Sequence, residues 1–216
     1  MANKNLTEMV FILDRSGSMS GLEADTIGGY NSLIEKQKKE EGDAVVTLVL
    51  FDDEYEIIHD RVALKKVKPI TSKEYYARGM TGLLDAIGRT INHIAERHKN
   101  ALDSEVPNKT MVTIITDGME NASREFNLPK IKQMIEEQKE KHGWEFLFLG
   151  ANIDAVSAAA DIGIDDDRAV KYCADSEGTQ MNFDVVGDVI CNVRANAPIT
   201  PDWKTDIEEH EKKNRR

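Results

Sequence analysis

The sequence predicts a three-layer α/β/α domain, in which a doubly wound, mostly parallel sheet lies between two layers of helices. Short continuous apolar runs, such as residues 9–13 and 111–116, alternate along the chain with longer segments of helical periodicity. Continuous apolar runs are typical of strands that are covered on both faces, and the alternation is typical of parallel sheets. The length of 216 residues is sufficient to bury such a sheet.

The first strand is expected at residues 9–13, and an amphipathic helix follows it. In this helix Ile27, Tyr30 and Ile34 recur at helical spacing, and the pattern stops near Gly42. Charged residues occupy the positions between them. The helix therefore has one apolar face and one charged face.

One strand at the edge of the sheet is expected to run antiparallel to the others. Residues 45–51 form an apolar strand, and residues 55–59 can pair with it after the short polar turn at 52–54. Because a parallel crossover needs a dozen or more residues, two strands this close together must be antiparallel.

A polar connection over residues 65–79 leads to a long helix that is expected to begin at Thr81, which occupies its N-cap position. Leu84, Ile87 and Ile91 form the apolar stripe of this helix. Beyond it, strands are predicted at residues 111–116, 144–149 and 169–172, with helices at 128–141, 153–161 and 179–194.

Residues 1–200 are expected to form a single domain, and residues 201–216 a charged, flexible tail in solvent. Hydrophobic residues make up 40% of the chain and charged residues 31%, which is typical of a globular protein. The net charge of −11 argues against nucleic-acid binding, because such surfaces are basic. Only about five apolar residues precede Asp14, too few for a signal-peptide core or a membrane span, so a cytoplasmic location without membrane contact is expected.

The cysteines and histidines show no metal-ligand spacing. Cys173 and Cys191 are not part of a C-x-x-C motif and have no histidine near them in the sequence, so two small, partly buried thiols are expected. The five histidines are scattered, and His93 and His98 are expected at the surface. No site with sulfur or imidazole ligands is therefore predicted.

Oxygen-bearing side chains follow two of the predicted strands. Residues 14–18 form the motif D-x-S-x-S directly after the first strand, and residues 116–118 form T-D-G after the strand at 111–116. Ligands of doubly wound sheets bind at the carboxyl ends of the strands, where the strand order reverses, so these side chains can meet there together with Thr81. Two carboxylates and three hydroxyls suit a hard divalent cation. The predicted metal ligands are Asp14, Ser16, Ser18, Thr81 and Asp117.

Each predicted ligand also has a structural explanation. The two aspartates could cap a helix or a turn, the two serines could lie in a flexible turn, and Thr81 could act only as an N-cap. Their occurrence together, in this order, favours the metal site. Asn152 and Asp154 follow another strand and are expected to cap the next helix.

Three further residues are candidates for the surroundings of the site. Asp85 lies one turn beyond Thr81 and could orient it, although a carboxylate near a helix N-terminus is favourable in any case. Arg15 is expected to point outward, to solvent or to a partner. Asp52 follows the strand at 45–51 and could contact the rim of the site, although a hairpin turn is the simpler explanation.

The order of these motifs resembles the von Willebrand factor A (VWA) domain family, which includes the integrin inserted domains and many compact bacterial and phage intracellular proteins. The resemblance rests on D-x-S-x-S, on the threonine at a helix start within residues 78–87 and on the aspartate of T-D-G, and it covers about residues 6–195. It implies a Rossmann-like sandwich with one antiparallel edge strand. It also implies an intact metal-ion-dependent adhesion site (MIDAS), in which the three hydroxyls bind the ion and the two aspartates bind it directly or through water.

The function that the resemblance implies is that of an interaction module. Mg²⁺ or Mn²⁺, with Ca²⁺ less favoured, would capture a glutamate or aspartate of a protein partner. A metal-assisted hydrolase that uses the same oxygens is the alternative, and a vestigial site with partners bound elsewhere is a third interpretation. Ser16 stands where an aspartyl phosphatase has its second aspartate, and the chain has neither G-x-S-x-G nor a P-loop. No general base lies near either aspartate in the sequence, so no catalytic residue is predicted.

Overall fold

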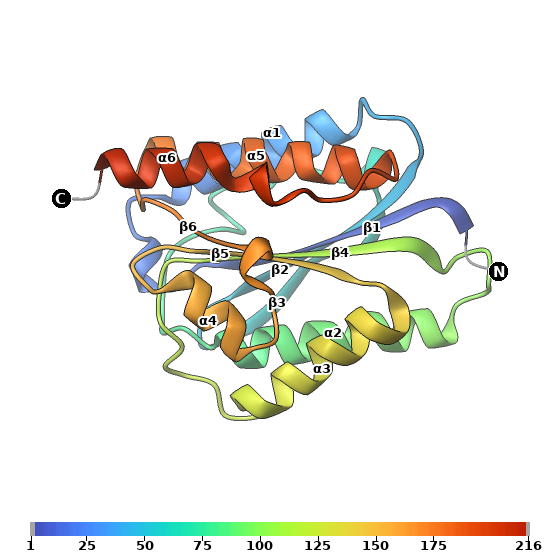
Figure 1. Ribbon diagram of the computed structural model, residues 1–216, viewed down its shortest axis with the longest axis horizontal. Coiled ribbons are helices and arrows are strands. Elements are labelled where there is room, and N and C mark those ends of the chain that lie inside the picture. Colours follow the sequence, from blue (N-terminus) through green and yellow to red (C-terminus); the bar gives the residue numbers. More distant parts are fainter. Residues whose placement is uncertain (1–2, 215–216) are drawn as a thin grey trace.

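The computed structural model describes residues 3–214, with side chains described from Leu6 onward, as a six-stranded sheet between two layers of helices (Figure 1). The strands are β1 (Asn3–Asp14), β2 (Asp43–Phe51), β3 (Tyr55–Ala63), β4 (Pro107–Thr116), β5 (Glu145–Gly150) and β6 (Ala169–Lys171). The helices are α1 (Glu23–Gln37), α2 (Leu83–Asn100), α3 (Leu128–His142), α4 (Ala155–Asp161), α5 (Ser176–Arg194) and α6 (Thr205–Asn214). Short 3₁₀ turns lie at η1 (Gly17–Met19), η2 (Leu64–Lys66), η3 (Asp166–Arg168) and η4 (Pro201–Lys204).

The strand order is β3-β2-β1-β4-β5-β6, and every neighbouring pair is parallel except β2 and β3. The predicted doubly wound sheet with one antiparallel edge strand is therefore confirmed. The order reverses at β1, which pairs with β2 on one side and with β4 on the other. The reversal therefore lies between β1 and β4, the two strands that the motifs follow.

The central strand β1 is apolar from Met9 to Leu13, where both of its faces are covered. Met9, Phe11 and Leu13 point into one core cluster, and Val10 and Ile12 point into the other. The alternation of side chains along a strand separates them in this way. One continuous apolar run thus contributes side chains to both core clusters.

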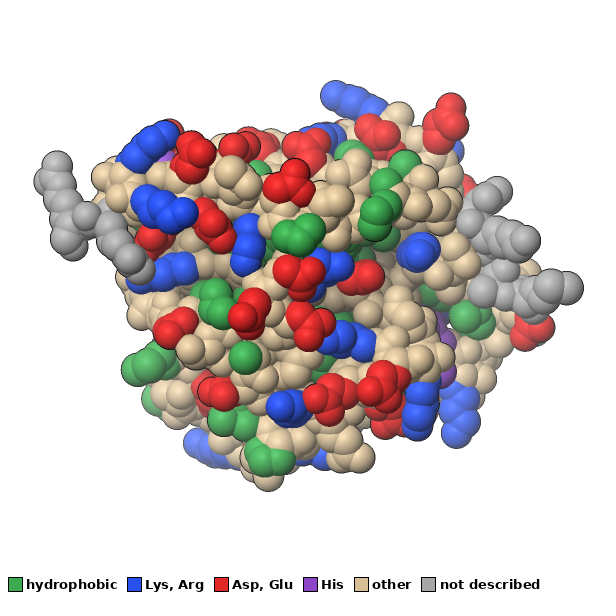
Figure 2. All heavy atoms as spheres, in the orientation of Figure 1, with side chains coloured by type: hydrophobic (Ala, Val, Ile, Leu, Met, Phe, Trp, Pro, Cys, Tyr) green, Lys and Arg blue, Asp and Glu red, His purple; other side chains and the backbone are tan. Residues whose placement is uncertain are grey.

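The helices cover both faces of the sheet, with α1, α5 and α6 on one face and α2, α3 and α4 on the other (Figure 1). The first core cluster contains residues of α1, α5 and α6, and the second contains residues of α2, α3 and α4. None of the helices within residues 3–214 combines the length and the apolar character that crossing a bilayer requires. Acidic and basic side chains are interspersed over the face of the molecule seen in Figure 2.

The C-terminal segment differs from the prediction of a solvated tail, which is wrong for residues 201–214. These residues form η4 and α6, and the side chain of Ile207 is 1% exposed within the first core cluster. The indole nitrogen of Trp203 donates a 2.7 Å hydrogen bond to the backbone oxygen of Asp167. The hydrophobic periodicity of α6 is weak in the sequence, because Ile207 is its one buried apolar residue. Arg215 and Arg216 lie outside the described residues.

Candidate metal centre

The five predicted ligand residues all lie at the carboxyl edge of the sheet. Asp14 is the last residue of β1, and Asp117 directly follows β4, its parallel neighbour. Because the two strands are adjacent where the strand order reverses, their carboxyl ends bring both aspartates to one place. Asp14 and Asp117 are 1% and 3% exposed, so both carboxyl groups are largely removed from water.

The three hydroxyl residues form a chain of contacts beside the aspartates. Ser16 Oγ lies 3.0 Å from Ser18 Oγ, and Thr81 Oγ1 donates to Ser16 Oγ over 3.1 Å. Adjacent oxygens around an octahedral Mg²⁺, with bonds of about 2.1 Å, are about 3 Å apart. The hydroxyl spacing therefore fits three neighbouring ligands of one small cation.

Gly118 keeps the space in front of these hydroxyls open. A Cβ atom at this position would lie 3.0 Å from Thr81 Oγ1 and 3.2 Å from Ser18 Oγ. Any other residue would therefore press on two of the predicted ligands. The T-D-G motif thus places a carboxylate and, one residue later, a residue without a side chain beside these hydroxyls.

Asp14 is held by hydrogen bonds from three segments. Its carboxylate accepts from the backbone N–H of Ser16 and from Thr116 Oγ1, each over 2.6 Å. The hydroxyl of Tyr75 donates to the backbone oxygen of Asp14 over 2.5 Å. Burial raises the pKa of Asp14, and the hydrogen bonds of Thr116 and Ser16 oppose this effect.

Asp117 is oriented by Asn152, whose side-chain nitrogen donates to its carboxylate. Asn152 has a φ of +54°, a conformation that asparagine tolerates better than most residues. Burial raises the pKa of Asp117 to about 6, the charge of Asp14 adds to this rise, and the Asn152 hydrogen bond opposes it. A cation bound beside both carboxylates would offset the cost of ionising them in this buried position.

The prediction that Thr81 is the N-cap of α2 is wrong. The loop that follows β4 positions Thr81 instead. The helix begins at Leu83, and Gly82 occupies the N-cap position. The backbone N–H of Thr81 donates to Asn121 Oδ1 over 2.9 Å, and the Thr81 oxygen accepts from the backbone of Asn121 over 3.0 Å. These reciprocal bonds fix the hydroxyl of Thr81 without using it as a cap.

Asp85 holds the same loop and has no hydrogen bond to Thr81 among the described residues. Its carboxylate accepts from the backbone N–H groups of Arg124, Glu125 and Phe126, each over 2.9 Å. These bonds lower the pKa of Asp85 although burial raises it. Asp85 therefore supports the loop that positions Thr81, rather than orienting Thr81 by contact.

The prediction that Arg15 points outward is wrong. Its side chain is fully buried, and its guanidinium forms ion pairs with Asp52 over 3.0 Å and with Glu56 over 2.7 Å. The backbone of Arg15 is bonded on both sides, to Phe51 and to Arg78. The side chain therefore points toward the β2–β3 hairpin, where the carboxylates of Asp52 and Glu56 compensate its charge.

Asp52 lies at the rim, as the position after β2 suggested, and it serves both the hairpin turn and an ion-pair network. Its carboxylate accepts from the backbone N–H of Glu54 over 2.6 Å, from Arg15 and from Arg78 Nε over 2.7 Å. Asp52 is 1% exposed, so it is an internal support and not a surface ligand.

Several supporting residues carry no signal in the sequence. Tyr75 and Asn121 lie in irregular segments, and Thr116 lies within an apolar strand. Asn152 was expected to cap a helix, but Asp154 is the residue that caps α4. Their roles depend on contacts between segments far apart in the chain, which residue spacing does not reveal.

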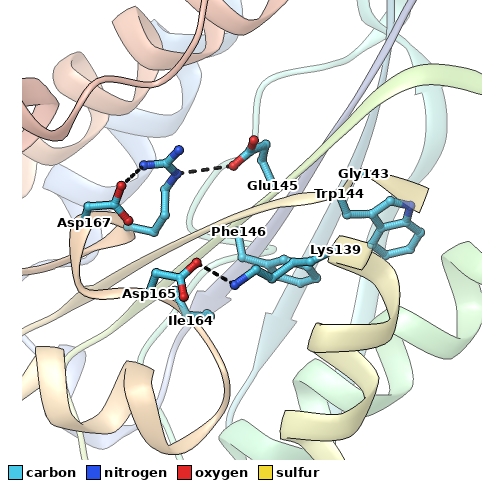
Figure 3. Close-up of a pocket in the computed structure, with 9 residues that line it drawn as sticks. Lys139, Gly143, Trp144, Glu145, Phe146, Ile164, Asp165 and Asp167 are labelled. Atoms are coloured by element: carbon cyan, nitrogen blue, oxygen red, sulfur yellow. Dashed lines mark hydrogen bonds and ion pairs between the residues drawn. The ribbon is translucent and has the colours of Figure 1, made fainter. Parts of the chain in front are cut away.

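A separate pocket of about 270 Å³ lies near the amino end of β5, away from the metal centre (Figure 3). Its charged side chains are already paired. Lys139 contacts Asp165 over 2.6 Å, and Arg168 contacts Asp167 over 2.7 Å. A polar pocket whose charges neutralise one another has no evident group left to bind a ligand.

Comparisons with known proteins were made for the sequence and for the fold. No protein-family model matches the sequence, and no curated protein matches it. Proximal thread matrix protein 1 of the mussel byssus has a similar structure, with a TM-score of 0.58 and 15% identity over 88% of this chain and 47% of that chain. A von Willebrand factor type A structure from Catenulispora acidiphila matches with a TM-score of 0.57 and 14% identity, over 87% of this chain and 42% of that chain.

Another structure of the mussel protein, with a TM-score of 0.58 and 15% identity over 88% of this chain and 46% of that chain, is described as having zinc in its MIDAS motif. The chain spans about half the length of these proteins. At such low identity the similarity establishes the fold and leaves activity open.

Proposed function

We propose that this chain, which has a VWA-type fold, is an interaction module that holds a divalent cation at the carboxyl edge of its sheet and uses it to capture an acidic side chain of a protein partner. The observation that carries the proposal is the spacing of the three hydroxyls, at 3.0 and 3.1 Å, beside two buried carboxylates. This arrangement fits one small cation with oxygen ligands.

The hydroxyls of Ser16, Ser18 and Thr81 would hold the ion, with Asp14 and Asp117 balancing its charge. Oxygen-only ligands at this spacing favour Mg²⁺ or Mn²⁺ over the larger Ca²⁺. A bound ion supplies a coordination position that a partner's carboxylate can fill. The chain itself has a net charge of −11, so an acidic side chain would be repelled without a cation.

The surroundings of the site suit a protein partner. Tyr76, Met80 and Met119 are 42%, 50% and 72% exposed, and all three lie in the segments that carry or flank the predicted ligands. Exposed apolar side chains around a polar centre are typical of interaction sites. The favoured partner therefore presents a carboxylate next to apolar residues.

The surroundings favour binding over hydrolysis. Within residues 3–214, the groups that hydrogen-bond to the five predicted ligands are hydroxyls, amides and backbone atoms. None of these is a histidine or a lysine that could act as a general base.

The metal step is tested by thermal unfolding of protein stripped with chelator. Mg²⁺ at about 100 times its Kd stabilises the folded state by about 2.7 kcal/mol, which corresponds to a rise in Tm of roughly 5–10 °C for a chain of this size. Ser18→Ala should abolish the rise, whereas Ser20→Ala, a control at the exposed serine two residues away, should keep it. An unchanged Tm in the wild type would exclude the metal centre.

The recognition step is tested by selecting displayed random peptides on the Mg²⁺-loaded protein and eluting them with chelator. Eluted peptides should share an aspartate or glutamate, and its replacement by asparagine or glutamine should abolish binding. Peptides that bind equally well in chelator, or that lack an acidic residue, would contradict acid capture while leaving metal binding intact.

A further inference from the structure

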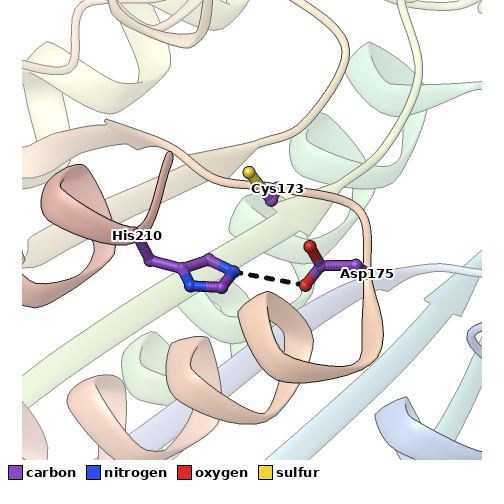
Figure 4. A group of neighbouring side chains, drawn as sticks. All are labelled: Cys173, Asp175 and His210. Carbon is purple, nitrogen blue, oxygen red and sulfur yellow. Dashed lines mark hydrogen bonds and ion pairs between the residues drawn. The ribbon is translucent and has the colours of Figure 1, made fainter. Parts of the chain in front are cut away.

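Cys173, Asp175 and His210 lie together although they are far apart in the sequence. The first two residues are in the segment between β6 and α5, and His210 is in α6. Their ligand atoms all lie within 4.8 Å of one another. Figure 4 shows Cys173 and Asp175 on the segment that enters α5 and His210 on the facing turn of α6.

The spacing of these atoms is close to that of zinc ligands. His210 Nε2 lies 3.3 Å from Asp175 Oδ1. Around a tetrahedral zinc ion, nitrogen and oxygen ligands are about 3.3 Å apart, and sulfur lies about 3.6 Å from either. The imidazole and the carboxylate already have this separation, and the sulfur needs to approach them by at most about 1.2 Å from the 4.8 Å limit.

The ligand-bearing segment is held in place by its own hydrogen bonds. Asp175 is the N-cap of α5, and its Oδ1 accepts from the backbone N–H of Gly178 over 2.7 Å. The backbone N–H of Asp175 donates to the oxygen of Cys173 over 2.9 Å. The two residues therefore keep a fixed relation to each other, which reduces the entropy cost of binding an ion.

The Nε2 atom of His210 faces Asp175, with whose Oδ1 it forms a 3.3 Å hydrogen bond. Its side chain is only 8% exposed, and the carboxylate of Glu177 lies 3.9 Å from Nδ1. Because a carboxylate only accepts, Nε2 donates to Asp175 Oδ1 in the metal-free protein, and the Asn214 side-chain nitrogen lies 3.2 Å from Nδ1. A zinc ion would take the place of the Nε2 proton between the ring and the carboxylate, because metal binding releases protons from its ligands. The Asn214 side chain donates to the backbone oxygen of His210 over 3.1 Å and keeps this turn of α6 in place.

We propose that Cys173, Asp175 and His210 form a second metal site that binds Zn²⁺ and ties α6 to the start of α5. One sulfur, one nitrogen and one oxygen ligand suit zinc and not Mg²⁺, whereas the centre at Asp14 has oxygen ligands alone. Three protein ligands leave a fourth position for water. The site is independent of the proposed interaction function, because it shares no residue with it.

Co²⁺ is the sharpest probe, because cobalt bound to a thiolate absorbs in the near ultraviolet through charge transfer and cobalt bound to oxygens does not. The 216-residue chain, kept in excess Mg²⁺, should show this absorption with one Co²⁺ per chain. Cys173→Ser should abolish it, and Cys191→Ser, at the other partly buried free cysteine, should keep it. Asp117→Ala should also keep it, which separates this site from the proposed MIDAS.

Zn²⁺ affinity, measured by competition with a chromogenic chelator, gives a second readout. His210→Gln should weaken binding at least tenfold, and circular dichroism should show that the variant remains folded. Zn²⁺ should also slow amide hydrogen exchange in α6 of the wild type. The proposal fails if the wild type shows no charge-transfer absorption, if Cys191→Ser removes it, or if His210→Gln binds Zn²⁺ as the wild type does.

Discussion

At the scale of single residues, the guanidinium of Arg15 is a charge buried inside the protein. It lies inside the D-x-S-x-S motif, and its main partner Asp52 is equally buried. Removing one member of such a pair leaves the other charge in a region of low dielectric without compensation. In the sequence, the structural residue Arg15 thus lies between two predicted ligands, Asp14 and Ser16.

Arg15→Ala should lower the free energy of unfolding by about 3–5 kcal/mol, because it leaves Asp52 partly uncompensated. Arg78→Ala is the matched control, because Arg78 contacts the same carboxylate but is 37% exposed, and it should cost less than about 1 kcal/mol. Urea unfolding followed by circular dichroism measures both values. Equal losses would show that burial does not determine the cost.

Asp117 gives a pH dependence to the metal-free protein. Burial raises its pKa from 3.8 to about 6, so the folded state binds a proton more tightly than the unfolded state does. Its ionisation therefore removes stability as the pH rises through that window. Asp117→Asn should raise the Tm of metal-free protein at pH 7 by a few degrees, have little effect near pH 4, and abolish the Mg²⁺-induced rise.

Scanning calorimetry at the two pH values in chelator measures this difference. If Asp117→Asn instead lowers the Tm at pH 7, the ionised carboxylate of Asp117 does not destabilise the metal-free protein.

At the scale of elements, the contact between α1 and α5 depends on one of two adjacent glycines. A Cβ atom on Gly29 would lie 2.3 Å from Phe183 Cδ2, whereas a Cβ atom on Gly28 would have no atom within 4 Å. The phenylalanine of α5 is 1% exposed and packs against the bare backbone of α1. The close approach of these helices thus requires glycine at a single position.

Gly28→Ala should stabilise the protein by about 0.5–1 kcal/mol, because alanine loses less backbone entropy in a helix than glycine does. Gly29→Ala should destabilise it by about 1–3 kcal/mol, because the added methyl group overpacks the contact with Phe183. Thermal unfolding of the two variants under identical conditions tests the opposite signs. Shifts in the same direction would contradict the packing that the structure assigns to this pair.

At the scale of the whole molecule, the two cores share the same sheet and should unfold together. Trp144 lies in the second core cluster, and Trp203 packs against the first. Each central strand contributes side chains to both clusters, so neither can be lost while the other keeps its strands. The polar C-terminal segment is part of this unit through Ile207.

Trp144→Phe and Trp203→Phe each leave one tryptophan to report on one core. Urea unfolding monitored by fluorescence in the two variants should match the midpoint that circular dichroism gives for the same variant. A fluorescence change for Trp203 at lower urea than the circular dichroism change would show that the C-terminal segment unfolds separately.

Residue patterns alone predict most of the sheet, because its strands are buried on both faces and stand out as apolar runs. The short polar turn after Phe51 predicts the antiparallel edge strand from chain length alone. The same patterns fail for α6, in which Ile207 is the one buried apolar residue, and for the start of α2, where Gly82 delays the helix by two residues. Weak periodicity hides an element whose stability comes from tertiary contacts.

The sequence by itself determined the fold class and the five oxygen-bearing residues at the carboxyl edge, because both depend on short-range order along the chain. Only the tertiary structure decided that Arg15 is buried, that Asn152 orients Asp117, and that Cys173 meets His210. These contacts join segments separated by tens of residues, and their energies depend on burial and on the approach of a second segment, which no local pattern records.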